Sequence, residues 1–203
     1  MLLFDIGNSN TKRYKNGKTD IADLPINERF YYICVNEKLR KSIPKNGVDI
    51  SSWFKFKSSY QNPGIDRIAA CYTIKEGIVV DAGSAITVDI MENGTHKGGF
   101  ILPGLASYQK CYATISPVLD KKLNKNISLD KLPQNTTDAV SFGVFASLKS
   151  LIENISGKKR IYLTGGDGEL LKNFIKNSVF KKELVFEGMI KAIKERDVNG
   201  CIA

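Results

Sequence analysis

One short pattern occurs twice in the chain with the same order of residue types. An apolar run leads into an acid, a glycine follows two positions later, a threonine six positions after the acid, and an Asn-Gly pair soon afterwards. The two copies cover residues 2–17 and 79–94. Each copy predicts a strand that ends in a carboxylate, a tight bend, a second strand and a hairpin turn, because glycine permits close bends and Asn-Gly favours two-residue turns.

The repeated acids are Asp5 and Asp81, and the repeated glycines are Gly7 and Gly83. Two such hairpins that face each other would bring two carboxylates and two sets of backbone N–H groups into one cleft. That combination suits a metal-bound polyphosphate. The alternative is a pair of ordinary hairpins whose acids only cap turns, and the match at acid, glycine and threonine in both copies favours the site.

The length of 203 residues allows one large domain or two small ones, and the repeat favours two, residues 1–76 and 77–203.

No apolar run approaches the roughly 20 residues of a membrane span, so no membrane partner is expected. Because residue 1 leads straight into the first strand, export is not expected either. The cysteines form no Cys-x-x-Cys pair, which favours a reducing cytoplasm; they are Cys34, Cys71, Cys111 and Cys201.

The chain carries a formal net charge of +9, which raises the question of nucleic-acid binding. Its lysines are spread along the chain, mostly at the predicted helix ends or on polar faces, where solvation explains them. We therefore expect no nucleic-acid partner. An attraction for anionic small molecules such as ATP remains an alternative use of the charge.

The segment from Gly64 to Arg67 lies at a predicted junction between a loop and a helix. Asp66 and Arg67 could serve as a general base beside a cation that recognises an anionic group. They could equally be a helix cap and surface charge, and the spacing alone leaves both readings open.

Four later features complete the pattern. Gly165 and Gly166 lie between a predicted strand and a predicted helix, which suits either a nucleotide contact or an ordinary turn. The helix predicted from residue 135 has apolar residues around much of its circumference, so it is either central in the core or part of a subunit interface. The single histidine, His96, is assigned to the surface, and residues 184–186 are predicted as the last strand.

The chain lacks the sequence motifs of several common enzyme classes. It has no P-loop, no Gly-x-Gly-x-x-Gly after a strand, no His-Glu-x-x-His and no Gly-x-Ser-x-Gly. P-loop kinases, Rossmann oxidoreductases and the common hydrolases are thereby disfavoured.

Taken together, these motifs resemble those of the type III pantothenate kinases, and the resemblance covers nearly the whole chain in order. Asp5-Ile-Gly-Asn8 is similar to the family's first phosphate motif, Gly64-Ile-Asp-Arg67 to its catalytic loop, and residues 81–87 to its second phosphate motif. Residues 98–104 and 135–139 are also similar to family signatures.

The resemblance implies an α/β fold of two ribonuclease H-like (actin-like ATPase) domains with a nucleotide cleft between them. It implies transfer of the ATP γ-phosphoryl group to pantothenate, the first step of coenzyme A biosynthesis. It also implies Mg²⁺, a monovalent cation (K⁺ or NH₄⁺), and a homodimer with pantothenate near the subunit boundary.

The resemblance and the residue chemistry together predict a set of site residues. Asp66 is predicted as the general base, Asp5 and Asp81 as metal ligands, and Arg67 as a residue that orders the loop or neutralises an anionic group. The predicted nucleotide contacts are Asp5, Gly7, Asn8, Ser84, Gly165 and Gly166, and the predicted pantothenate contacts are Tyr60, Gly64, Ile65, Arg67 and Thr136.

Two other functions compete with this reading. The Bvg accessory factors, which are regulators without catalytic activity, share the family's sequence, but a regulator has no need for both Asp5 and Asp66. Another kinase or phosphatase of the actin-like superfamily is the enzymatic alternative, and only the Gly-x-Asp-Arg loop favours pantothenate over a sugar.

Overall fold

The computed structural model describes residues 1–25 and 27–200, so Cys201 lies outside the described part. The chain forms two compact units. Unit 1 contains Met1–Glu76, Asp89–Gly98 and the segment from Lys181 onward, and unit 2 contains Gly77–Val88 and Gly99–Phe180. This division by packing does not test the predicted domain boundary between residues 76 and 77, which stays a prediction.

The first five-stranded sheet lies in unit 1 and has the order β3-β2-β1-β4-β5. Its central strand β1 pairs antiparallel with β2 and parallel with β4, and β4 pairs parallel with β5. The strands are β1 (Leu2–Ile6), β2 (Thr11–Lys15), β3 (Lys18–Ile21), β4 (Phe30–Cys34) and β5 (Gly47–Asp49).

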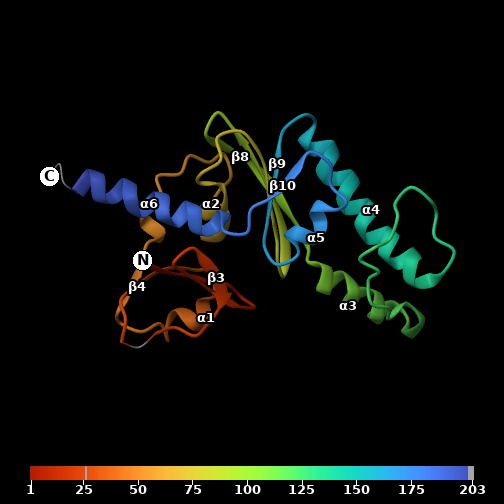
Figure 1. Cartoon of the computed structure of the whole chain (residues 1–203), viewed down its shortest axis with the longest axis horizontal. Helices are drawn as coiled ribbons and strands as arrows, with labels where there is room; N and C mark the ends of the chain where they lie inside the picture. Colours follow the sequence, from red (N-terminus) through yellow and green to blue (C-terminus); the bar gives the residue numbers. More distant parts are fainter. Residues whose placement is uncertain (26, 201–203) are drawn as a thin grey trace. The chain divides into compact units, whose positions relative to one another are not determined.

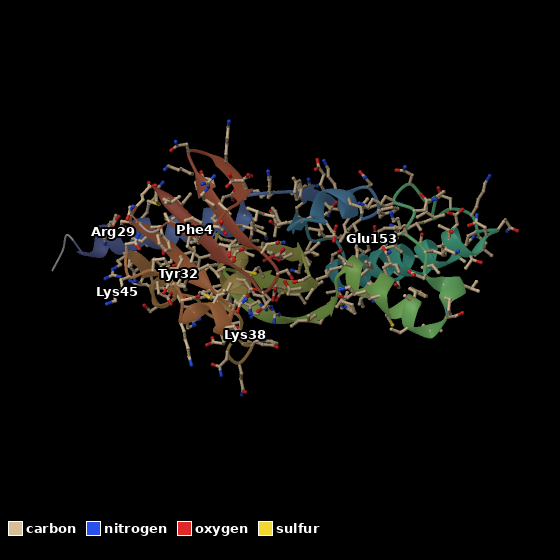
Figure 2. The ribbon with its side chains drawn as sticks, turned by 90° about the horizontal axis from the view of Figure 1, so that it is seen from below. Phe4, Arg29, Tyr32, Lys38, Lys45 and Glu153 are labelled. Carbon is tan, nitrogen blue, oxygen red and sulfur yellow. The ribbon has the colours of Figure 1, made fainter. Side chains whose placement is uncertain are left out.

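All five residues of β1 are buried, as expected for an apolar central strand covered on both faces. Phe4 packs edge-to-face on Phe30, with ring centroids 5.1 Å apart, and Tyr32 packs against the same cluster (Figure 2). This packing fixes the end of β1, where Asp5 lies.

The helices of unit 1 are α1 (Glu37–Arg40), α2 (Ile65–Cys71) and α6 (Leu184–Gly200), with a 3₁₀ turn at Ser51–Trp53. Helix α6 lies beside α2, as Figure 1 shows. The backbones approach so closely that a Cβ on Gly188 would come within 2.0 Å of the Ala69 carbonyl oxygen.

The predicted strand at residues 184–186 is wrong, because these residues begin helix α6. Val185, Met189 and Ala192 are buried at helical spacing, and the last strand is instead Ser178–Phe180. A run of three apolar residues does not by itself distinguish a strand from the start of a buried helix.

The second five-stranded sheet has the order β10-β9-β6-β7-β8. Its strands are β6 (Gly77–Ala82), β7 (Ala85–Glu92), β8 (Thr95–Pro103), β9 (Ile161–Thr164) and β10 (Ser178–Phe180). When the strands of each sheet are numbered along the chain, both sheets have the spatial order third, second, first, fourth, fifth. The sequence repeat is therefore also a repeat of topology. The tip of the β7–β8 hairpin, residues 89–98, belongs to unit 1.

Both predicted Asn-Gly turns are confirmed. Asn16 and Gly17 have φ of 53° and 80°, and Asn93 and Gly94 have φ of 51° and 72°. Two successive residues with positive φ suit the two-residue turn that matches the twist of a hairpin.

The helices of unit 2 are α3 (Leu105–Ile115), α4 (Thr136–Ser156) and α5 (Gly168–Lys172), with a 3₁₀ turn at Pro117–Leu119. Helix α4 is central to this unit: Phe145 is buried and its ring stacks on that of Phe174, with centroids 4.3 Å apart. Helix α3 buries only Leu105. Within the described residues, no helix has the length and apolar character that crossing a membrane requires.

Candidate active site

Asp5 lies near the end of β1 and is 6% exposed. In the β1–β2 pair it is opposite Lys12, whose Nζ lies 3.8 Å from Asp5 Oδ2. The loop that follows is tight, since Gly7 N–H donates to the Asn10 carbonyl at 3.1 Å, while Asn8 is exposed. A nearly buried carboxylate, a lysine and an exposed loop thus lie together at the end of one strand.

Asp66 lies in the first turn of α2, two positions after the N-cap residue Gly64. Its Oδ1 accepts a hydrogen bond from the Arg67 backbone N–H at 2.8 Å. A Cβ on Gly64 would come within 2.5 Å of the same oxygen, so glycine leaves the space that this carboxylate occupies. The side chain of Asp66 is therefore held against the start of its own helix.

The side chain of Arg67 points into a buried polar group within unit 1. Its Nε donates to both oxygens of Asp89 at 3.1 Å, and its Nη2 donates to Asp89 Oδ1 at 2.6 Å. Burial alone would lower the pKa of Arg67, but the hydrogen bonds and charge of Asp89, followed by the Tyr60 hydroxyl, raise that pKa above its ordinary value. The guanidinium also lies 4.7 Å from the centroid of the Tyr60 ring.

Asp89 has a second partner, His96, whose Nε2 lies 2.8 Å from Asp89 Oδ1. The prediction that His96 lies on the surface is wrong, since it is only 1% exposed. Sequence reasoning also missed Asp89. The available signal was an acid between apolar residues of β7. An acid that is buried in such a strand needs a cation as its partner.

In unit 2, Asp81 lies at the end of β6 opposite Thr164 of β9. The turn after β9 passes over it: a Cβ on Gly165 would come within 2.4 Å of Asp81 Oδ1, and Gly165 has a φ of +84°. Gly166 is exposed, and nothing lies within 4 Å of the position its Cβ would take. The structure therefore places Asp81 directly beside the Gly165 turn, while the metal and nucleotide roles predicted for these residues stay predictions.

Ser84 is exposed in the bend between β6 and β7. Its carbonyl oxygen accepts the Gly104 N–H at 3.2 Å, and a Cβ on Gly104 would come within 2.3 Å of the Gly83 carbonyl oxygen. The start of α3 therefore holds this bend in place.

Thr136 is the first residue of α4. The helix cap is its neighbour Asn135, whose side chain accepts the Asp138 N–H at 2.9 Å. The side chains of Asn124 and Asn135 also hydrogen-bond to Asp138 and lower the pKa of that carboxyl.

The structure groups the predicted residues within each unit. Tyr60, Gly64, Ile65, Asp66 and Arg67 come together at the start of α2 in unit 1, which also contains the Asp5 loop. Asp81 and Gly165 come together in unit 2, which also contains Ser84 and Thr136. Among the residues described, no group of three or more histidine, cysteine, aspartate or glutamate side chains could hold a metal ion by itself.

Two sheets of identical strand order, each with an acid at the end of its first strand, define an actin-like ATPase or sugar kinase fold. The same fold is seen in MreB 5 of Spiroplasma citri bound to AMPPNP, with a TM-score of 0.50 at 12% identity, covering 98% of each chain. The predicted fold class is confirmed.

Comparisons of sequence then identify the family. Residues 41–158 match the family model of the type III pantothenate kinases. The type III pantothenate kinase of Campylobacter jejuni is 47% identical over 96% of this chain and 97% of its own length. A solved Campylobacter jejuni structure, described as a Baf family transcriptional activator, is 46% identical with a TM-score of 0.88, covering 97% of this chain and 99% of that one. The chain belongs to the type III pantothenate kinases, and the predicted family and enzyme class are confirmed.

Proposed function

We propose that this chain transfers the γ-phosphoryl group of ATP to pantothenate, which gives 4′-phosphopantothenate and ADP and begins coenzyme A biosynthesis. The observation that carries this proposal is the carboxylate of Asp66, fixed at the start of α2 beside the Tyr60–Arg67 pair. Family membership supplies the substrates.

In this reaction Asp66 acts as the general base. The pantothenate hydroxyl oxygen forms a bond to the γ-phosphorus, its proton passes to Asp66, and the bond from the γ-phosphorus to the bridging oxygen of ADP breaks. Phosphoryl transfer depends mainly on positioning and charge stabilisation, so a base of fixed orientation is the contribution this loop makes.

Asp5 fits a role beside Mg²⁺. In phosphotransferases this ion binds through one or two carboxylates and keeps water and phosphate oxygens as its other ligands. Asp5 is a nearly buried carboxylate beside Lys12, so the chain offers both a ligand for a cation and a positive charge for a phosphate. When bound, Mg²⁺ neutralises phosphate charge, and we assign Asp81 a supporting role toward the cations.

The remaining nucleotide contacts are proposed at exposed backbone. Asn8, Ser84 and Gly166 are exposed, and Gly7 and Gly165 occupy tight bends where a side chain would be crowded. A monovalent cation, K⁺ or NH₄⁺, belongs to the same proposal and is supported by the family resemblance alone.

For pantothenate, the geometry favours one of the two roles considered for Arg67. Its charge is already balanced by Asp89, so we assign Arg67 to ordering the loop rather than to neutralising a substrate anion. Tyr60 is 39% exposed while its ring covers the Arg67 guanidinium, which leaves part of it accessible to substrate. Gly64, Ile65 and Thr136 complete the proposed set of pantothenate contacts.

We further propose a homodimer, in which Thr136 lies near the pantothenate of the neighbouring subunit. Supporting this, α3 buries only Leu105, whereas Ile115 and Val118 near its end are 66% and 63% exposed. Phe145 of α4 is in the core of its own unit and so is not an interface residue. A cytoplasmic location is proposed from the free thiols Cys34 and Cys111.

A coupled assay of ADP release tests the proposal directly. We expect release to require both pantothenate and Mg²⁺, and to rise when K⁺ or NH₄⁺ replaces Na⁺. ADP release that does not depend on pantothenate would point to another acceptor. Absence of ADP release, together with tight and salt-resistant binding to duplex DNA, would support the regulator suggested by the Baf description.

A further inference from the structure

Three ionisable side chains are buried together in unit 1, and the phosphoryl-transfer step uses none of them as a reactant. Arg67, Asp89 and His96 are 6%, 1% and 1% exposed. Burying such groups is unfavourable unless each is paired, and packed apolar residues would often give equal stability. Their presence therefore calls for a role other than stability.

The group continues toward the surface through one serine. His96 Nδ1 lies 2.8 Å from Ser58 Oγ. Ser58 Oγ in turn accepts the Tyr60 N–H at 2.9 Å and lies 3.1 Å from the Tyr60 carbonyl oxygen. The contacts thus run from Arg67 through Asp89, His96 and Ser58 to Tyr60. The series closes because the Arg67 guanidinium lies 4.7 Å from the centroid of the Tyr60 ring.

The backbone supports the same arrangement. Residues 57–59 lie along the start of β8, where His96 N–H donates to the Lys57 carbonyl at 3.0 Å and Ser59 N–H donates to the His96 carbonyl at 2.9 Å. The backbone on both sides of Ser58 is therefore held by the backbone of His96. The Ser58 side chain then contacts the backbone of Tyr60.

The position of each proton decides which atom donates and which accepts in these hydrogen bonds. Asp89 accepts hydrogen bonds from Arg67, so it is a carboxylate, and His96 Nε2 must donate to it. In the neutral form of His96 with its proton on Nε2, Nδ1 is an acceptor for the single hydroxyl proton of Ser58. In this state Ser58 Oγ can receive the Tyr60 N–H but cannot also donate to the Tyr60 carbonyl.

From this closed loop of contacts we infer that Ser58, Asp89 and His96 are positioning residues that hold Tyr60 over Arg67 and so set the affinity for pantothenate. The inference rests on the proposed function, because it assigns these residues to substrate recognition in that reaction. None of the three touches the reacting atoms. Their effect passes through Tyr60.

The test compares Ser58→Ala with the matched control Ser59→Ala, whose serine is exposed next in the chain. We expect Ser58→Ala to raise the KM for pantothenate by about three- to tenfold, the usual effect of one lost hydrogen bond. The KM for ATP, kcat and the melting temperature should stay close to wild type, and Ser59→Ala should change none of the four quantities.

His96 provides a rescue experiment. The amide of glutamine offers one donor and one acceptor, as neutral imidazole does, whereas leucine offers neither. We expect His96→Leu to raise the pantothenate KM more than His96→Gln does. Equal effects of the two variants would overturn the role assigned to the hydrogen bonds of His96.

A double-mutant cycle tests whether Ser58 acts through Tyr60. If it does, Ser58→Ala combined with Tyr60→Ala should raise the pantothenate KM no further than Tyr60→Ala alone. Multiplicative effects, or an unchanged pantothenate KM in Ser58→Ala, would refute the inference. A wild-type protein without pantothenate-dependent activity would instead refute the proposed function, so the two failures are distinguishable.

Discussion

Asp66 illustrates how a single residue can be fixed in orientation by its own helix. Its Oδ1 accepts the N–H of the next residue, and Gly64 leaves room for it. One carboxylate oxygen is thus engaged by the backbone, which sets the direction of the other. Because the backbone holds the side chain, a substitution by asparagine can keep its position and remove only its ability to accept a proton.

Asp66→Asn therefore tests basicity alone. The amide oxygen can still accept the Arg67 N–H, but the side chain cannot take a proton. We expect kcat to fall by about 10²- to 10⁴-fold, the usual effect of removing a general base, with little change in ATP affinity. Asp23→Asn, at an exposed acid in the same unit, is the control. A variant at Asp66 that keeps more than about half of the wild-type kcat would remove this residue from the mechanism.

Asp5 leads to a separate prediction, because its carboxylate lies close to the positive charge of Lys12. We expect Asp5→Asn to need a higher Mg²⁺ concentration for half-maximal activity, since an amide is a weaker ligand for Mg²⁺ than a carboxylate. A Mg²⁺ titration of the initial rate measures this directly. Asp20→Asn, on strand β3 of the same sheet, serves as the control. An unchanged Mg²⁺ requirement would leave Asp5 with a structural role.

The sequence reveals some functional residues more readily than others. Asp5, Asp66 and Asp81 stand beside glycines at the ends of predicted elements, where an acid is conspicuous. Asp89 and His96 lie inside strands. Their role depends on the contact between Asp89 and Arg67, which are 22 residues apart in the chain. Only the folded chain shows that these three side chains meet.

At the scale of elements, the hairpins were predictable and the last strand was not. The Asn-Gly turns mark both hairpins because few other residue pairs adopt two positive φ angles. The end of the chain offers no comparable signal, and the apolar run at residues 184–186 predicts a strand where α6 begins. Its helical character depends on packing against α2, which local sequence does not encode.

That packing leads to a prediction about Gly188, where α6 crosses α2. Because a Cβ there would come within 2.0 Å of a backbone oxygen, the two helices cannot keep their separation in Gly188→Ala. We expect the free energy of unfolding to fall by about 1–3 kcal/mol, the usual cost of overpacking. Denaturant unfolding measures it, with Lys194→Ala at an exposed position of the same helix as the control. Equal stability of the two variants would show that the helices can separate without loss.

At the scale of the whole molecule, one repeated pattern accounts for both of the loops that we propose as phosphate-binding loops. Both sheets have the same strand order, and each first strand ends near an acid. The repeat was visible in the sequence because acid, glycine and threonine keep their spacing. The membership of residues 89–98 in unit 1 was not visible, since it depends on packing at the tip of the β7–β8 hairpin.

The proposed assembly gives the last prediction. Helix α3 and the turn that follows it present Ile115 and Val118 to solvent in the isolated chain, and closed two-fold dimers are the commonest way to cover such surfaces. We expect light scattering at micromolar concentration to give twice the chain mass of 22.5 kDa. Val118→Glu should give monomers with little activity, because a charge would be buried without a partner.

The control for this experiment is Ile21→Glu, which places the same charge at a 68% exposed isoleucine of β3 and should leave the mass unchanged. Phe145→Glu is unsuitable, because its ring stacks on Phe174 inside one unit and the change would unfold that unit. If the wild-type protein is an active monomer, Thr136 cannot act on a neighbouring subunit's pantothenate. If it is a dimer that Val118→Glu leaves intact, the interface lies elsewhere and the exposed end of α3 needs another explanation.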